Sequence, residues 1–194
     1  LFSTWWDSLR YAHNKMRHIA LITNGNIDKE FIADSKKEGL KEILFSLHGY
    51  DSESHDKITG IKGSWDKIIL AIEQAKKENL LIRLNIVLNE FNYLNLKSQA
   101  NLIKDINPVG VNYLTLNKWG DVKEKHLIPY EKLMKPLKES LNIIKKIPFI
   151  NVRNIPYCFL QGYDKYVCGW YQQCFDFWDW RIELSELPVI RKEV

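Results

Sequence analysis

A regular alternation of short apolar segments and amphipathic segments constrains the fold of this chain most. Residues 18–23 (HIALIT), 42–48 (EILFSLH), 81–88 (LIRLNIVL) and 111–116 (VNYLTL) are rich in aliphatic and β-branched residues, which is typical of buried strands. A helix-type pattern separates them, so the strand–helix unit recurs about every 30 residues. Consecutive strands of this kind lie parallel and are joined by right-handed crossovers. The sequence therefore predicts an α/β fold, either an open doubly wound sheet or part of a barrel.

The segments between these strands set the expected helices. We expect helices at residues 29–39, 65–79, 92–106 and 129–146, with Ser64 as an N-cap, and a further extended segment at 148–155. Residues 50–62 are polar and are expected to form a loop. The first residues have a helical pattern that begins without a methionine, so we expect the chain to be a fragment of a longer protein.

Composition narrows the class of protein. The chain has 194 residues, 45% of them hydrophobic, and a net charge of +4, which is ordinary for a globular domain. Basic and acidic residues alternate, so we expect no nucleic-acid partner. No apolar run reaches the roughly 18 residues that a membrane-spanning helix needs, and residues 1–10 lack a signal pattern. We therefore expect a cytoplasmic protein with no membrane partner.

Polar side chains collect where the predicted strands end. In parallel α/β folds the carboxyl ends of the strands carry the functional residues. The candidates are Thr23, Asn24, Ser46, His48, Arg83, Asn85, Thr115 and Asn117. A charged residue such as Arg83 inside an apolar strand needs a partner or a ligand. Alternation along the strands puts Ser46, Arg83 and Asn85 on the inward parity, so we expect all three to project into the same concave surface. Several polar strand faces that converge predict a hydrated cavity.

Structural roles remain open for the same residues. Thr23, Asn24 and Ser46 are also residues that cap turns. Arg83 is also able to pair with a structural acid, and His48 to be a hydrogen-bonded loop histidine. The chain has no GxSxG, GxxxxGK or HExxH motif, so the residues alone predict no reaction.

An ordered set of motifs resembles the radical S-adenosylmethionine (SAM) superfamily. The motifs are LITNG (21–25), FSLHGYDSESHDKITGIKGSWDKIILAI (45–72), RLNIVLNEFNYLNL (83–96) and VNYLTLN (111–117). The resemblance implies a parallel, partial TIM-like (β/α) barrel, of which residues 1–146 would form the third to sixth units. Residues 147–194 would be a C-terminal extension.

The resemblance also implies cofactors and a reaction. These enzymes cleave SAM reductively with a [4Fe-4S] cluster and use a 5′-deoxyadenosyl radical to abstract hydrogen from a substrate. The ligands of that cluster, a Cys-x3-Cys-x2-Cys motif, are expected upstream of Leu1, because Cys158, Cys168 and Cys174 are separated by nine and five residues. An electron donor such as a flavodoxin or ferredoxin is the implied partner.

Residue by residue, the resemblance assigns a SAM site. It places Thr23, Asn24, Ser46, His48, Arg83, Asn85 and Asn117 near SAM. Arg83 would meet the SAM carboxylate and so have no acidic partner in the protein, and His48 replaces a commoner Asp.

The C-terminal cysteines leave two interpretations open. The segment 151–174 resembles a stretch that holds an auxiliary cluster in some peptide-modifying members, so Cys158, Cys168 and Cys174 are candidate Fe–S ligands. The alternative is free cysteines packed among aromatic residues.

Three functions are consistent with these observations. The first is a radical SAM enzyme that acts on a peptide or small molecule, and the second is a member that modifies RNA, which the small net charge disfavours. The third is a degenerate, non-catalytic barrel that acts as a binding or partner-recruiting module.

Overall fold

The computed structural model describes residues 3–15, 18–116 and 126–168. Six parallel strands form one sheet in the order β1-β2-β3-β4-β5-β6. The strands are β1 (Ala20–Thr23), β2 (Glu42–Ser46), β3 (Leu81–Leu88), β4 (Gly110–Thr115), β5 (Phe149–Arg153) and β6 (Val167–Cys168). The predicted parallel order of the first four strands is confirmed. The extended segment predicted at 148–155 is confirmed as β5.

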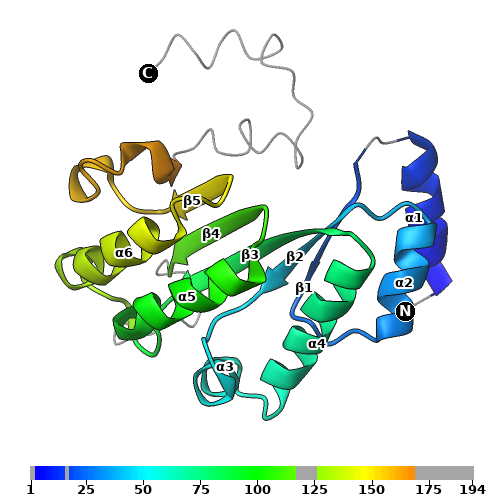
Figure 1. Ribbon diagram of the computed structural model, residues 1–194, viewed down its shortest axis with the longest axis horizontal. Coiled ribbons are helices and arrows are strands. Elements are labelled where there is room, and N and C mark those ends of the chain that lie inside the picture. Colours follow the sequence, from blue (N-terminus) through cyan, green and yellow to red (C-terminus); the bar gives the residue numbers. More distant parts are fainter. Residues whose placement is uncertain (1–2, 16–17, 117–125, 169–194) are drawn as a thin grey trace, which may run out of the picture.

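Helices lie along the sheet, one before the first strand and the others in the connections from β1 to β5 (Figure 1). They are α1 (Ser3–Lys15), α2 (Lys29–Lys37), α3 (Ser52–Thr59), α4 (Ser64–Lys77), α5 (Leu96–Ile106) and α6 (Tyr130–Ile144). Short 3-10 turns are found at Tyr93–Asn95, Tyr157–Phe159 and Asp164–Tyr166. None of the described helices is long and apolar enough to cross a membrane.

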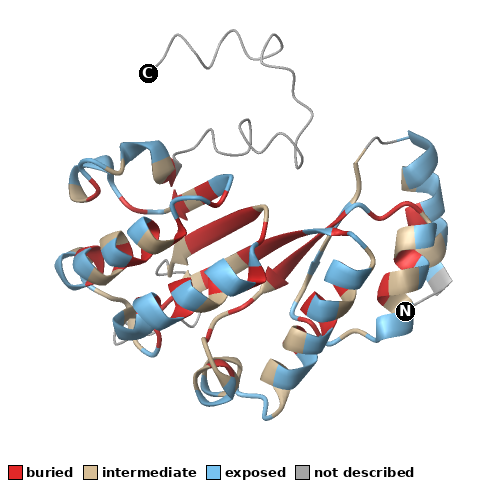
Figure 2. Ribbon diagram, in the orientation of Figure 1, coloured by how far each residue is buried: buried red, intermediate tan, exposed pale blue. Residues whose placement is uncertain are grey.

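Strand alternation separates the two faces of the sheet. Ile43 and Phe45 of β2 and Leu84 and Ile86 of β3 are fully buried, because one parity of each strand packs against the helices. In Figure 2 the ribbons of β2, β3 and β4 are largely red, the colour of buried residues. The other parity faces away from the helices of the described residues, and we call that side the open face.

Two expectations about the connections were wrong in detail. The polar segment after β2 was expected to be a loop, but it contains α3. Asp51 is the N-cap of this helix, and its carboxylate accepts a hydrogen bond of 2.8 Å from the Ser54 N–H. Ser64 is the first residue of α4 rather than its N-cap, which is Gly63.

The division of the chain at residue 146 remains a prediction. That boundary lies between α6 and β5, and β5 and β6 continue the same sheet beyond it.

Candidate functional site

A row of four polar side chains crosses the open face. Ser46, Asn85, Asn112 and Asn151 are register partners on β2, β3, β4 and β5. Their parity is opposite to that of the buried Ile43 and Phe45, so all four project from the face that the described helices do not cover.

The three asparagines of this row are joined by their side-chain amides. Asn112 Nδ2 donates to Asn85 Oδ1 at 2.7 Å, and Asn151 Nδ2 donates to Asn112 Oδ1 at 2.9 Å. Asn112 is buried, whereas Asn85 and Asn151 are half-buried. We call these three residues the amide relay.

The two members of the row on β2 and β3 each have a polar group without a hydrogen-bond partner among the described residues. Among the described residues, neither Ser46 Oγ nor Asn85 Nδ2 has a hydrogen-bond partner, and neither atom is sealed from solvent. A hydroxyl and an amide N–H on adjacent strands can together bind the oxygen atoms of a ligand. The expectation that Ser46 and Asn85 share one face is confirmed by their register.

Arg83 belongs to a closed ion-pair cluster instead. Its Nη1 donates to Glu42 Oε1 at 3.3 Å, and His18 Nε2 lies 2.9 Å from Glu42 Oε2. Arg83 and Glu42 are only 2% and 1% exposed. The expectation that Arg83 has no acidic partner is wrong, because Glu42 opens β2 on the same face and reaches it. The acid in the otherwise apolar segment EILFS was the signal for this pair.

Thr23 and Asn24 close the turn after β1. Thr23 Oγ1 accepts from the Gly25 N–H, and Asn24 Oδ1 accepts from the Asn26 N–H, both at 3.1 Å. Thr23 is the register partner of the buried Phe45, so it faces the helices. These are the turn-capping roles that the sequence left open, and a SAM contact for either residue remains a prediction. Asn117 lies outside the described residues.

His48 completes the end of β2 with its side chain. The last ladder bond of the strand is from the Leu47 N–H to the Asn85 carbonyl, at 3.0 Å. Beyond it, the Val87 N–H donates to His48 Nδ1 at 3.3 Å, and Gln99 Nε2 donates to the Leu47 carbonyl at 3.0 Å. Side chains therefore replace the backbone partners that a longer strand would supply.

Two further side chains hold this strand end. Asn92 Nδ2 donates to the carbonyls of His48 and Val87, at 2.9 and 2.8 Å. His55 Nδ1 accepts from the N–H groups of His48 and Gly49, at 3.2 and 3.4 Å. A Cβ at Gly49 would collide with the His55 backbone nitrogen, so this close approach requires glycine. We call His48, His55, Asn92 and Gln99 the β2 clamp.

The clamp fixes the protonation of both histidines. Because each Nδ1 accepts a backbone N–H, each ring is neutral and carries its proton on Nε2. Burial, and then the repulsion that a protonated His55 would exert on a protonated His48, lower the pKa of His48 to about 4. Burial also lowers the pKa of His55. His48 is therefore a fixed donor near neutral pH rather than an acid–base group.

The run HDKITGIKGS (residues 55–64) builds the start of the next helix. The Asp56 carboxylate accepts from the Gly63 N–H at 2.5 Å and from the Ser64 hydroxyl and Trp65 N–H, both at 2.9 Å. The bond from the Trp65 N–H is the largest of the effects that lower the pKa of Asp56. The carboxylate caps the start of α4, so this part of the motif is structural.

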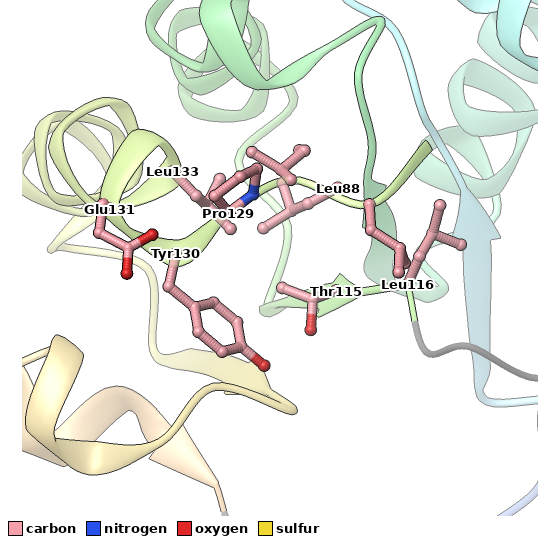
Figure 3. Close-up of a pocket in the computed structure, with 9 residues that line it drawn as sticks. Leu88, Thr115, Leu116, Pro129, Tyr130, Glu131 and Leu133 are labelled. Atoms are coloured by element: carbon pink, nitrogen blue, oxygen red, sulfur yellow. The ribbon is translucent and has the colours of Figure 1, made fainter. Parts of the chain in front are cut away.

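A hollow of about 480 Å³ lies at the ends of β3 and β4 beside the start of α6 (Figure 3). Its walls are mainly apolar, and Leu88, Leu116 and Leu133 lie around it. The hydroxyls of Thr115 and Tyr130 both donate to the Asn154 carbonyl, at 3.1 and 3.0 Å. This hollow is separate from the polar row, and its hydroxyls are already bonded.

The cysteines do not form a metal centre within the described part of the chain. Cys158 is exposed, and no group of three His, Cys, Asp or Glu residues among those described could hold a metal ion. The side chain of Cys168 and the whole of Cys174 lie outside the described residues, so an auxiliary cluster there remains a prediction.

Sequence reasoning missed half of the polar row and half of the β2 clamp. Asn112 and Asn151 have the same parity as Asn85 in their strands, so counting alternate residues along residues 111–116 and 148–155 would have found them. Asn92 and Gln99 carried no such signal, because they reach β2 from a turn and a helix.

The part of the chain that contains β1 to β3 is also similar to known proteins. Residues 5–93 match the family model for the radical SAM superfamily. A GTP 3',8-cyclase of Clostridium perfringens is 24% identical over 131 residues, which are 67% of this chain and 40% of that protein. A probable GTP 3',8-cyclase of Saccharolobus islandicus is 29% identical over 119 residues, 56% of this chain and 38% of that protein. The chain thus spans about two fifths of the length of these curated relatives.

Solved structures share the fold. A domain of pyruvate-formate lyase-activating enzyme from Bacteroides vulgatus superposes with a TM-score of 0.60 at 18% identity, and the match covers 77% of this chain and 89% of that one. The structure described as native anSMEcpe with bound AdoMet gives a TM-score of 0.59 at 15% identity, covering 86% and 45%. The expected partial barrel architecture is therefore confirmed.

Proposed function

Because residues 5–93 belong to the radical SAM superfamily, we propose that this chain forms a SAM-binding wall of a radical SAM enzyme that modifies a peptide or small-molecule substrate. Enzymes of this superfamily use SAM and a [4Fe-4S] cluster, which together supply a radical that abstracts hydrogen from the substrate. The observation that carries the proposal is the pair of available groups, Ser46 Oγ and Asn85 Nδ2, on the open face of the sheet.

The residues present suit SAM better than they suit the cluster. The SAM carboxylate and ribose need hydrogen-bond donors, and Ser46, Asn85 and the Nε2–H of His48 are such donors. Asn24 is exposed at the end of β1 and remains a candidate for the same site. Arg83 is left out, because Glu42 already neutralises it. The three cysteines lack the Cys-x3-Cys-x2-Cys spacing, so in the proposed enzyme the cluster would be bound by cysteines outside this sequence.

The chain's own residues would bind and orient SAM. Ser46 and Asn85 would donate to its oxygen atoms, and the amide relay, with the buried Asn112 at its centre, would keep this wall rigid and limit access of water. His48 would donate a further hydrogen bond without changing its charge near neutral pH. A small electron-transfer protein such as a flavodoxin or ferredoxin would supply the electron.

The curated relatives suggest which small molecule to test first. By their names they act on GTP, so GTP is the first candidate, with a peptide as the other class. The non-catalytic barrel is the competing function.

The decisive experiment uses the whole protein that contains this chain, prepared anaerobically with iron and sulfide. On reduction with dithionite it should convert SAM to 5′-deoxyadenosine and methionine in equal amounts, measured by mass spectrometry. Ser46→Ala combined with Asn85→Leu should raise the Kd for SAM, and Ser98→Ala on the exposed side of α5 is the matched control. A protein with an intact cluster that neither binds nor cleaves SAM would instead be the non-catalytic barrel.

A further inference from the structure

The amide relay has a direction, and this direction decides what Asn85 presents. Each amide has a donor end and an acceptor end, and every relay bond runs from a higher strand number to a lower one. Asn151 donates to Asn112, and Asn112 donates to Asn85. The acceptor end of Asn85 is thereby occupied, and its NH₂ group has no partner among the described residues, on a strand position whose other register partner is Ser46.

We propose that Asn112 and Asn151 are positioning residues that fix the orientation of the Asn85 amide, so that this wall presents donors and selects ligand atoms that accept hydrogen bonds. The inference rests on the proposed function for the identity of the ligand as SAM, but the orientation of Asn85 is a property of the chain alone.

Burial makes Asn112 the dominant member of the relay. Its side chain lies between Asn85 and Asn151 and the residue is only 2% exposed, so water cannot readily replace either relay bond. If Asn85 turned its amide over, two NH₂ groups would face each other, and a buried donor would be left unsatisfied. Asn112 therefore penalises the reversed orientation of Asn85.

Asn151 acts one step further away. It fills the acceptor of Asn112, which keeps the donor end of Asn112 pointed at Asn85. Because Asn151 is half-buried and water can partly replace its amide, its contribution is expected to be smaller.

The first test needs no ligand. In the protein without SAM, NMR should show slow solvent exchange for a side-chain amide proton of Asn112 and of Asn151, and fast exchange for both amide protons of Asn85. Asn112→Leu, which is similar in size but cannot hydrogen-bond, should leave Asn85 free to adopt both orientations. Slow exchange at Asn85 in the unaltered protein would overturn the proposed direction of the relay.

The second test is a double-mutant cycle on SAM affinity in the whole protein. Asn112→Leu should raise the Kd for SAM by about tenfold, on the order of one hydrogen bond to a charged group. In a protein that already carries Asn85→Leu, the same change should have almost no further effect, because Asn112 acts through Asn85. Asn101→Leu on the exposed side of α5 is the control and should leave the Kd unchanged.

Each outcome has one meaning. Additive effects of the two substitutions, or an unchanged Kd in Asn112→Leu when Asn85→Leu weakens binding, would reduce Asn112 to a structural residue. Asn151→Leu, at a less buried position, serves if Asn112→Leu does not fold, and it should raise the Kd by about two- to threefold. If the unaltered protein binds no SAM, the proposed function fails, while the exchange experiment still decides the relay.

Discussion

Two polar layers lie on the same face of β2 and β3, and they are built in opposite ways. The layer nearer the strand starts holds the buried ion pair of Glu42 and Arg83, and the half-buried His18 ring lies against the same Glu42 carboxylate. The next layer holds the neutral residues Ser46 and Asn85. Among the described residues, Ser46 Oγ and Asn85 Nδ2 have no hydrogen-bond partner. The charged layer is thus paired internally, and we call it the closed layer. The neutral layer has groups without a partner among the described residues, and we call it the open layer. A polar residue on this face is therefore not a candidate binding residue by its polarity alone. It becomes one when its polar atoms lack hydrogen-bond partners among the described residues.

The largest effect should come from breaking the closed layer. Glu42→Gln leaves the buried Arg83 without its acid, so we expect a loss of about 3 to 5 kcal/mol in the free energy of unfolding, measured with urea. Adding Arg83→Met should recover part of that loss, because the uncompensated charge is removed. Glu73→Gln on the exposed side of α4 is the control. A small effect of Glu42→Gln would mean that the closed layer is not the stabilising one.

The pH dependence of stability should come from the β2 clamp, beside the open layer. The pKa of His48 is about 4 in the folded protein and about 6.5 when the chain is unfolded. The unfolded chain therefore binds more protons between these values, so stability should fall as the pH falls from 6.5 to 4, by roughly 3 kcal/mol. His48→Asn, which keeps an acceptor for the Val87 N–H, should reduce this slope in urea unfolding at several pH values. An unchanged slope would assign it to other groups.

Asn85→Leu should separate binding from stability. We expect the Kd for SAM in the whole protein to rise about tenfold. The free energy of unfolding should change by about 1 kcal/mol, much less than for Glu42→Gln, because Asn85 is only half-buried. Calorimetric titration with SAM and urea unfolding would be run on the same preparations. A large loss of stability with unchanged SAM affinity would place Asn85 with the closed layer.

Ser46→Ala should have the smallest effect of the series. The hydroxyl has no hydrogen-bond partner among the described residues, so its loss should change stability by less than about 0.5 kcal/mol. The Kd for SAM should rise about two- to fivefold, the cost of one neutral hydrogen bond. Ser98→Ala is the matched control for both measurements.

The sequence predicted the open layer better than the closed one. Alternation within EILFS and LIRLNIVL placed Ser46 and Asn85 together, because parity in a parallel sheet is decided by local spacing. The partner of Arg83 depends on how far Glu42 reaches across two strands, which the spacing within one strand does not contain. The same limit hid Asn92 and Gln99, whose roles arise only when the chain folds back to the end of β2.

The β2 clamp also constrains how this sequence can diverge. Its four side chains take the place of backbone partners, so replacing one of them leaves a main-chain N–H or carbonyl unpaired. An aspartate at position 48 would retain an acceptor for the Val87 N–H, whereas an alanine would not. Substitutions at positions 48, 55, 92 and 99 should therefore accumulate as coordinated sets, and this strand end should evolve as one unit.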